Sequence, residues 1–313
     1  MPEIKARPFL LEQLMRPVNT GRIVHAMIFS GLAGTGRTEA AEYVARALNC
    51  TGTGVKPCGV CASCRRFLDG KAPELIRLEP ENENKKPAKY IKIEQVRALL
   101  RETALHPLSG YKCVIIKPAD SMTEEAQNAL LKTLEEPPEY AVFFLITEKD
   151  RALLQTIRSR CVLYRFAPIS VDEIKLGLEK AGYYGEEAEI AASYSGGSMG
   201  KALEFCGDKE FFTLYTKLAE AFELLARTGS ISLAGPQLAD MEGRKQLCLD
   251  ILEISASELM RGAIKTRLAA ALKSCRIDGA ELMQALTECR KRLESNVMFR
   301  YAADMLLFDI VKH

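Results

Sequence analysis

GLAGTGRTEA, residues 31–40, matches a phosphate-binding loop at every defining position except one. The motif requires Gly, four residues, Gly, Lys and then Ser or Thr, placed between a strand and a helix. Gly31, Gly36 and Thr38 hold three of these places, MIFS precedes the loop and TEAAEYVARAL follows it. Arg37, however, stands where Lys is expected. The stretch predicts a strand–loop–helix unit of the phosphate-binding kind and leaves open whether it still acts on ATP.

The chemistry of this loop depends on its backbone and on two side chains. Backbone N–H groups and a helix N-terminus would face a phosphate, so the candidate binding residues are Gly31, Gly34, Gly36, Arg37 and Thr38. The hydroxyl of Thr38 would coordinate Mg²⁺. Arginine is longer, planar and forked where lysine is compact, so the exchange is not conservative at a tight site. Binding of ATP and Mg²⁺ by this chain is in doubt, and phosphoryl transfer more so.

A second element of an ATP site is also altered. Hydrolysis in this architecture needs acidic residues at the end of a neighbouring strand, where they hold Mg²⁺ and orient water. In the candidate strand CVIIKPAD, Lys117 and Pro118 stand where the carboxylates are needed, and Asp120 comes beyond the expected strand end. Two departures in one site argue against hydrolysis more strongly than either alone.

Apolar runs alternate with helical patterns in the first half of the chain. The runs are rich in Val, Ile and Phe, as in buried parallel strands, and cover residues 25–31, 75–80, 112–119, 141–148 and 161–166. Helices are predicted between them, over residues 37–49, 93–104, 123–136 and 150–158. The alternation predicts an α/β domain with a parallel sheet, up to about residue 167.

The pattern after residue 167 is helical. Ser170 and Glu173 form a capping-box pattern for a helix that starts near Val171, and residues 170–206 suggest three short helices. Long amphipathic patterns follow, with Pro236 expected in a loop, and they cover residues 210–228, 244–274 and 279–311.

Length, charge and polarity set broad limits. A chain of 313 residues suggests two to three domains, and a net charge of +2 gives no global attraction to nucleic acid or membrane. The N-terminus lacks the apolar core of a signal peptide, and no apolar run approaches the ~20 residues that span a bilayer, so we expect a cytoplasmic protein. The polar segment 81–89 is expected to be an exposed loop or hairpin tip.

Four of the ten cysteines form a cluster with metal-ligand spacing. Cys50, Cys58, Cys61 and Cys64 follow a C-x7-C-x2-C-x2-C pattern, with Pro and Gly for tight turns. Four thiolates suit tetrahedral Zn²⁺ and close its coordination shell, so a structural zinc is the first interpretation. An iron–sulfur cluster and unliganded thiols stay open as alternatives, whereas disulfides are not expected in the cytosol. The other six cysteines are interpreted as small apolar residues.

Several longer motifs resemble a known family. NALLKTLEEPPEYAVFFLIT (128–147), TIRSRC (156–161), CGVCASC (58–64) and GGSMGKALEF (196–205) resemble the clamp-loader branch of the AAA+ ATPases, over the N-terminal two thirds of the chain. The resemblance implies an α/β AAA+ (P-loop NTPase-like) domain over residues 1–167 with a zinc module inserted at 50–64. A small helical lid domain over 168–208 and an all-α collar domain over 209–313 would follow.

The resemblance also implies roles for single residues. In hydrolysing relatives the segment that matches GSMGKAL carries an arginine that senses ATP, and here that position is Gly200. Ser159, Arg160 and Cys161 match a Ser-Arg-Cys motif that presents an arginine finger to the ATP of the adjacent subunit. Arg160 is therefore the candidate catalytic residue, acting in trans. With its altered phosphate loop, the chain resembles the members of the branch that do not hydrolyse ATP and act as a rigid stator.

The partners implied by the resemblance are the tau/gamma and delta subunits of a DNA polymerase III clamp loader, joined in a hetero-pentamer. The sliding clamp and primer–template DNA would be met through the assembled complex, and no membrane is involved. The implied function is to help load the clamp onto primed DNA during replication.

Two other functions stay open. One is an active tau/gamma-like ATPase that tolerates Arg37. The other is a plain zinc-dependent DNA-binding module, which is disfavoured because no basic stripe or recognition helix is present. Glu135 and Glu136, which stand before two prolines, are interpreted as a solvated helix end and not as catalytic carboxylates.

Overall fold

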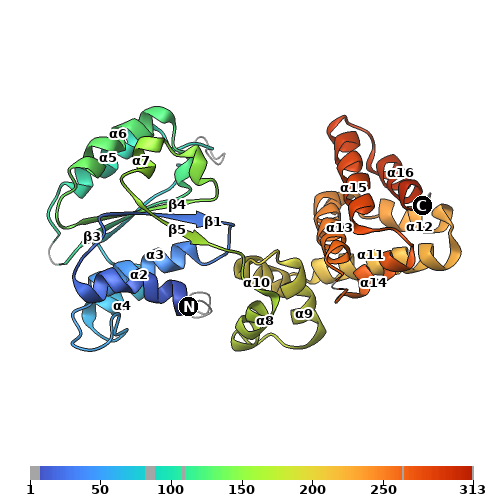
Figure 1. Ribbon diagram of the computed structural model, residues 1–313, viewed down its shortest axis with the longest axis horizontal. Coiled ribbons are helices and arrows are strands. Elements are labelled where there is room, and N and C mark those ends of the chain that lie inside the picture. Colours follow the sequence, from blue (N-terminus) through green and yellow to red (C-terminus); the bar gives the residue numbers. More distant parts are fainter. Residues whose placement is uncertain (1–7, 82–88, 108–109, 263, 312–313) are drawn as a thin grey trace. The chain divides into compact units, whose positions relative to one another are not determined.

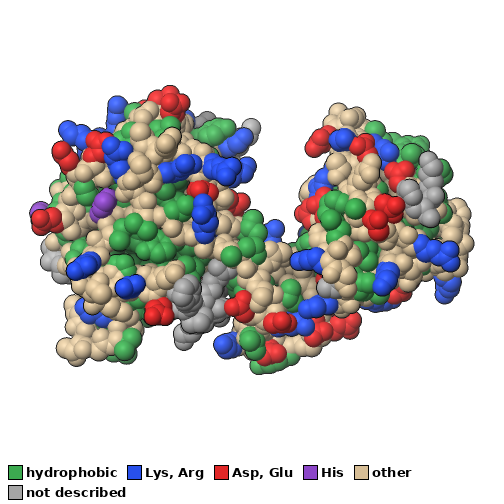
Figure 2. All heavy atoms as spheres, in the orientation of Figure 1, with side chains coloured by type: hydrophobic (Ala, Val, Ile, Leu, Met, Phe, Trp, Pro, Cys, Tyr) green, Lys and Arg blue, Asp and Glu red, His purple; other side chains and the backbone are tan. Residues whose placement is uncertain are grey.

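The computed structural model describes residues 8–81, 89–107, 110–262 and 264–311. The chain divides into two compact units, one of residues 1–177 with 197–200 and one of residues 178–196 with 201–313 (Figure 1). Of the polar segment 81–89, residues 82–88 lie outside the described residues. On the face drawn in Figure 2, acidic and basic side chains are interspersed over each unit, which agrees with the small net charge.

A parallel sheet is the framework of the first unit. Its five strands are β1 (Ala26–Gly31), β2 (Leu75–Leu78), β3 (Lys112–Ile116), β4 (Ala141–Thr147) and β5 (Val162–Phe166). They lie in the order β2-β3-β4-β1-β5, and every neighbouring pair is parallel. The predicted strands are confirmed within three residues at each end, because the central strands β3 and β4 are buried on both faces and read as continuous apolar runs.

Helices cover both faces of this sheet (Figure 1). One face carries α2 (Pro8–Thr20), α3 (Arg37–Leu48) and α4 (Ala62–Leu68), and the other carries α5 (Ile93–Thr103), α6 (Glu124–Glu135) and α7 (Gln155–Arg158). Successive strand residues alternate between the two layers: Phe143 packs in the core with α5 and α6, and Phe144 packs in the core with α2 and α3. The first unit is therefore a three-layer α/β domain.

Three short helices follow the sheet, as predicted: α8 (Val171–Lys180), α9 (Gly185–Tyr194) and α10 (Met199–Gly207). The expected cap of α8 is present, since the backbone N–H of Ser170 donates to Glu173 and that of Glu173 donates to the Ser170 hydroxyl.

The described elements of the second unit are all helical. After α9 and α10 come α11 (Lys209–Thr228), α12 (Ile231–Ala239), η3 (Glu242–Arg244), α13 (Lys245–Met260), α14 (Arg267–Ser274), α15 (Gly279–Glu294) and α16 (Phe299–Val311). Their apolar faces form one core around Phe222, Leu252 and Leu307. The Tyr194 hydroxyl bonds Ser255 and Thr266, so α9 is tied to α13 and to the start of α14.

Three helix predictions and one loop prediction are wrong in detail. Residues 150–158 form a short 3-10 helix, η2 (Asp150–Ala152), and then α7, with extended backbone at Leu153 between them. Residues 244–274 are two helices, because Gly262 adopts a left-handed conformation (φ +67°) and Thr266 caps a new start. Residues 279–311 are also two helices.

The position of Pro236 also differs from the prediction. Pro236 lies inside α12 and not in a loop. The side chains of Ala234 and Leu238, on the same helix, are buried and hold it in place. None of the described helices is both long and apolar enough to cross a membrane.

Candidate functional site

The loop between β1 and α3 has the backbone form that the motif predicts. Gly34 and Gly36 have φ angles of +70° and +86°, a region that residues with a Cβ rarely adopt. Gly36 is the N-cap of α3, and Thr38, half-buried, is the second residue of that helix. The first N–H groups of a helix have no partner within it, so this turn retains donors for an anion.

The tip of the loop is closely covered by residues 198–200. The backbone N–H of Gly200 donates to the Gly34 carbonyl at 3.2 Å, and a Cβ on Gly34 would collide with the Ser198 hydroxyl. A Cβ on Gly200 would lie 3.2 Å from the Gly34 Cα, so a side chain at position 200 would start beside the loop. Glycine supplies no side chain there that could contact a phosphate, and its N–H donates to the Gly34 carbonyl.

Arg37 is bound inside the chain. Its side chain is only 7% exposed, one terminal nitrogen donates to the backbone carbonyl of Thr147, and the other lies 3.6 Å from a carboxylate oxygen of Glu148. Burial lowers the pKa of the guanidinium, and the nearby carboxylates of Glu148 and Asp120 oppose that effect. Arg37, which stands in the place of the motif lysine, therefore links the start of α3 to the end of β4.

The carboxyl end of β3 offers little to a magnesium ion. β3 ends at Ile116, Lys117 is exposed beyond it, and Asp120 lies in the 3-10 turn η1 (Ala119–Ser121), as expected from the sequence. One carboxylate oxygen of Asp120 is buried without a hydrogen-bond partner among the described residues. A single half-buried carboxylate does not make the acidic pair that holds Mg²⁺ and orients water.

Arg160 lies just after α7, at the turn that leads into the edge strand β5. One terminal nitrogen is 2.6 Å from a carboxylate oxygen of Glu135, and the other donates to the Thr156 carbonyl at 2.9 Å and to the Ser159 hydroxyl at 3.4 Å. The side chain stays 34% exposed. Arg158 is exposed, and its side chain contacts no hydrogen-bond or ion-pair partner among the described residues. The structure therefore holds Arg160 by ion pairing while leaving it accessible to solvent.

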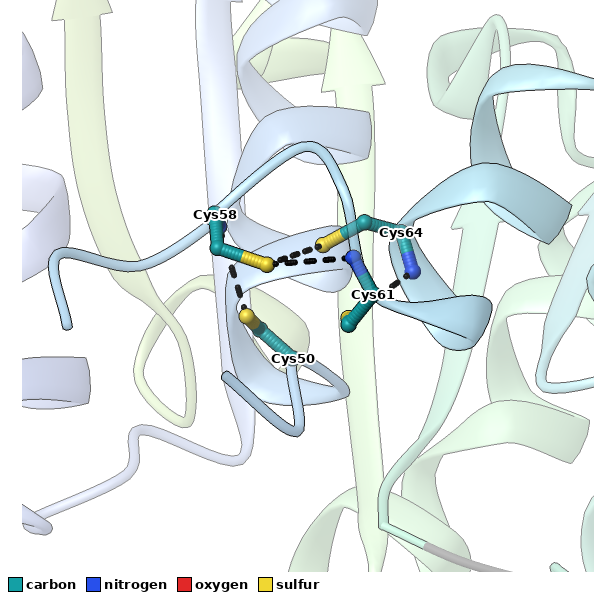
Figure 3. A group of neighbouring side chains, drawn as sticks. All are labelled: Cys50, Cys58, Cys61 and Cys64. Carbon is teal, nitrogen blue, oxygen red and sulfur yellow. Dashed lines mark hydrogen bonds between the residues drawn. The ribbon is translucent and has the colours of Figure 1, made fainter. Parts of the chain in front are cut away.

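The four clustered cysteines converge on one point (Figure 3). Cys50 follows α3, Cys58 lies in the loop, Cys61 caps α4 and Cys64 lies in its first turn. Their sulfur atoms all lie within 4.8 Å of one another. Tetrahedral zinc with Zn–S bonds of about 2.3 Å places sulfurs about 3.8 Å apart, so a small contraction suffices for an ion.

Backbone N–H groups are directed at these sulfurs. Cys58 N–H donates to Cys50 Sγ at 3.3 Å, Cys61 N–H to Cys58 Sγ at 3.3 Å and Cys64 N–H to Cys61 Sγ at 3.4 Å. These bonds lower the pKa of Cys58, and lower that of Cys61 to about 5, whereas burial raises the pKa of Cys64 to about 12. A bound cation would favour the thiolate at all four positions. The donor set and its hydrogen bonds fit a structural metal ion.

Three partners of the predicted site residues were not found from the sequence. They are Thr147 and Glu148, which bind Arg37, and Glu135, which binds Arg160. Thr147 contributes a backbone atom, which no side-chain motif reveals. The sequence predicts Glu135 to be a solvated helix end, and its side chain is 46% exposed but ion-paired.

The strand order, the Gly-rich loop after β1 and the helices on both faces define a AAA+ (P-loop NTPase-like) domain. A family model described as "DNA polymerase III, delta subunit" matches residues 6–170, and the chain belongs to this family. The expectation of a clamp-loader AAA+ protein is thereby confirmed.

Curated relatives agree with this family. The chain is 32% identical over 220 residues to DNA polymerase III subunit delta' of Bacillus subtilis, covering 70% of this chain and 65% of that protein. It is 36% identical over 201 residues to subunit delta' of Escherichia coli, covering 63% and 59%. It is also 36% identical over 179 residues to subunit tau of Escherichia coli, covering 56% and 27%. The chain thus spans about a quarter of the tau protein and less than two thirds of the length of either delta' relative.

Proposed function

We propose that this chain is a delta-prime subunit of the DNA polymerase III clamp loader. It would be a AAA+ subunit that does not hydrolyse ATP, supplies Arg160 to the ATP site of a neighbouring subunit and helps load the sliding clamp onto primed DNA. The proposal rests mainly on the contacts of Arg37, which donates a hydrogen bond to the Thr147 carbonyl and pairs with the Glu148 carboxylate of the same chain.

The state of the ATP site supports the absence of turnover. The motif lysine is replaced by a guanidinium whose hydrogen-bonding groups are partly used inside the domain. Lys117 and Pro118 leave the end of β3 without the acidic pair, and Gly200 leaves the loop without a cationic side chain above it. Phosphoryl transfer depends on positioned positive charge and a metal ion. The motif lysine, the acidic pair that would hold the metal ion and the arginine that would sense ATP are all replaced in this chain.

The partly exposed position of Arg160 supports a role in trans. Negative charge on the γ-phosphate oxygens is stabilised by a guanidinium from an adjacent subunit, an effect of about 10³–10⁵ in rate in nucleotide hydrolases. A subunit with an inactive ATP site would retain such an arginine because it serves the neighbour's site.

An apolar stripe on the last helix supports assembly with other subunits. Tyr301, Met305 and Phe308 of α16, with Met298 just before the helix, are 42–63% exposed and recur at helical spacing, whereas Leu307 on the same helix is fully buried in the core. We assign the tau/gamma and delta subunits as the partners that cover this stripe, in a hetero-pentamer.

The experiment is reconstitution of the complete complex with Arg160→Ala. The variant should fold and assemble, and ATP turnover on primed DNA should fall partially because only one of several sites loses its finger. Clamp loading should fall with it. Arg158→Ala is the matched control, since Arg158 is exposed in the same motif. Equal turnover and loading by the Arg160→Ala and unmodified complexes would show that Arg160 is not the finger, and a loss in Arg158→Ala alone would move the assignment to Arg158.

The alternative is an active tau/gamma-like ATPase. The 36% identity to a tau subunit and the retained Thr38 at the start of α3 favour it. Turnover by the isolated chain separates the two proposals.

A further inference from the structure

We propose that Glu135 is a positioning residue for Arg160: its carboxylate holds the guanidinium in the orientation from which it reaches a phosphate on a neighbouring subunit. The inference rests on the proposed function, in which Arg160 serves that neighbour's ATP. It adds the residue that prepares Arg160 for this role.

Three acceptors of the chain fix the guanidinium. Glu135 accepts from one terminal nitrogen at 2.6 Å, and the Thr156 carbonyl and Ser159 hydroxyl accept from the other. A guanidinium has five N–H groups in a fixed plane, so roughly two remain for an incoming anion. Binding that anion then requires less ordering of a long side chain than it would from a free arginine.

The place of Glu135 in its helix is not explained by helix stability. Glu135 is the last residue of α6 and Glu136 is its C-cap, where the helix dipole disfavours negative charge. Lys132 is the one basic residue in that last turn. The cation of Arg160 offsets the unfavourable position of Glu135, whereas no ion pair of Glu136 is recorded within the described part of the chain.

The two residues are held in a fixed relation by the core beneath them. Leu134 of α6 and Ile157 of α7 are buried in the same apolar cluster. The side-chain carboxamide of Gln127 in α6 accepts from the Leu154 N–H at 2.8 Å and donates to the Met122 carbonyl at 3.2 Å. The helix that bears Glu135 and the segment that bears Arg160 therefore share one apolar core and a hydrogen bond, so their contact is supported by the packing of the domain.

The test uses the complete reconstituted complex with Glu135→Gln, and Glu136→Gln as the control. Both changes remove one charge from the same helix end, but only the first removes the ion pair with Arg160. Glu135→Gln should lower kcat by about two- to fivefold at the site served, the range of a partly exposed ion pair, with KM for ATP unchanged. It should have no further effect in an Arg160→Ala background.

A second measurement reads the side chain directly. In NMR relaxation of the isolated chain, the Nε–H order parameter of Arg160 should fall in Glu135→Gln and stay unchanged in Glu136→Gln. The inference is overturned if kcat and this order parameter are the same in both variants, while Arg160→Ala still lowers turnover. If Arg160→Ala itself has no effect, the finger assignment fails and this inference fails with it. A loss from Glu135→Gln that persists in the Arg160→Ala background would show a merely structural role.

Discussion

Arg37 donates a hydrogen bond to the backbone carbonyl of Thr147, 110 residues further along the chain. The bond joins the first residue of α3 to the last residue of β4. The Glu148 carboxylate also lies 3.6 Å from the guanidinium, so Arg37 has two partners within the domain. These contacts hold the guanidinium at the end of β4 and occupy part of its hydrogen-bonding capacity.

Removal of this contact should destabilise the first unit. Arg37→Ala leaves the Thr147 carbonyl without a side-chain donor, at a cost of about 1–3 kcal/mol for a buried group. The midpoint of thermal unfolding should fall by about 2–4 °C for each kcal/mol. Arg158→Ala, which removes an exposed arginine from the same unit, should leave the midpoint unchanged. Equal midpoints for the Arg37→Ala and unmodified proteins would contradict a structural role.

Protein purified without chelator should contain one tightly held Zn²⁺ per chain, because four sulfurs and their N–H donors converge between α3 and α4. Elemental analysis gives the stoichiometry. Cys61→Ser should lose the ion and loosen residues 50–64 in hydrogen exchange, while the helices of the second unit keep their protection. Cys206→Ser, outside the cluster, should retain the ion. Iron in place of zinc, or no metal at all, would overturn the assignment.

The second unit should lose stability as pH rises through the pKa of Glu258. Burial raises this pKa above its usual value of 4.5, against the opposing effects of the hydrogen bond from Thr266 and the charges of Arg261 and Lys265. The folded state therefore binds the proton more tightly than the unfolded state. The resulting stabilisation is present below pH 4.5 and is lost as pH rises through the folded pKa.

Glu258→Gln stays neutral and can still accept from Thr266, so it should melt at a higher temperature than the unmodified protein at pH 7. The advantage should vanish near pH 4. Glu204→Gln, at an exposed position of the same unit, should show no such dependence. A melting difference that is constant between pH 4 and pH 7 would contradict the protonation argument.

Local patterns explain what could be predicted about the fold. β3 and β4 are buried on both faces and were recognised as apolar runs, and the cap of α8 was recognised from Ser170 and Glu173. The breaks inside 244–274 and 279–311 were missed because apolar periodicity continues across them. Gly262 and Thr266 mark the first break, and Asn296, with φ of +60°, marks the second. These single residues are weak signals against a long amphipathic pattern.

The candidate site was predicted in its residues but not in its contacts. The thiol cluster needed only spacing, because its ligands are close in sequence. The partners of Arg37 and the approach of Gly200 to Gly34 depend on the packing of distant segments. Sequence patterns alone do not specify such pairs, since the fold brings them together.

The central claim is that the chain has the fold of a AAA+ ATPase but does not hydrolyse ATP. Steady-state ATP hydrolysis by the isolated protein tests this claim most directly. With ATP and Mg²⁺ in excess, phosphate release should stay at the level of a buffer control at every protein concentration. Arg37→Lys should not restore it, because Lys117, Pro118 and Gly200 are unchanged. Hydrolysis that rises in proportion to protein concentration and disappears in Thr38→Ala would contradict the account and favour a tau/gamma-like ATPase.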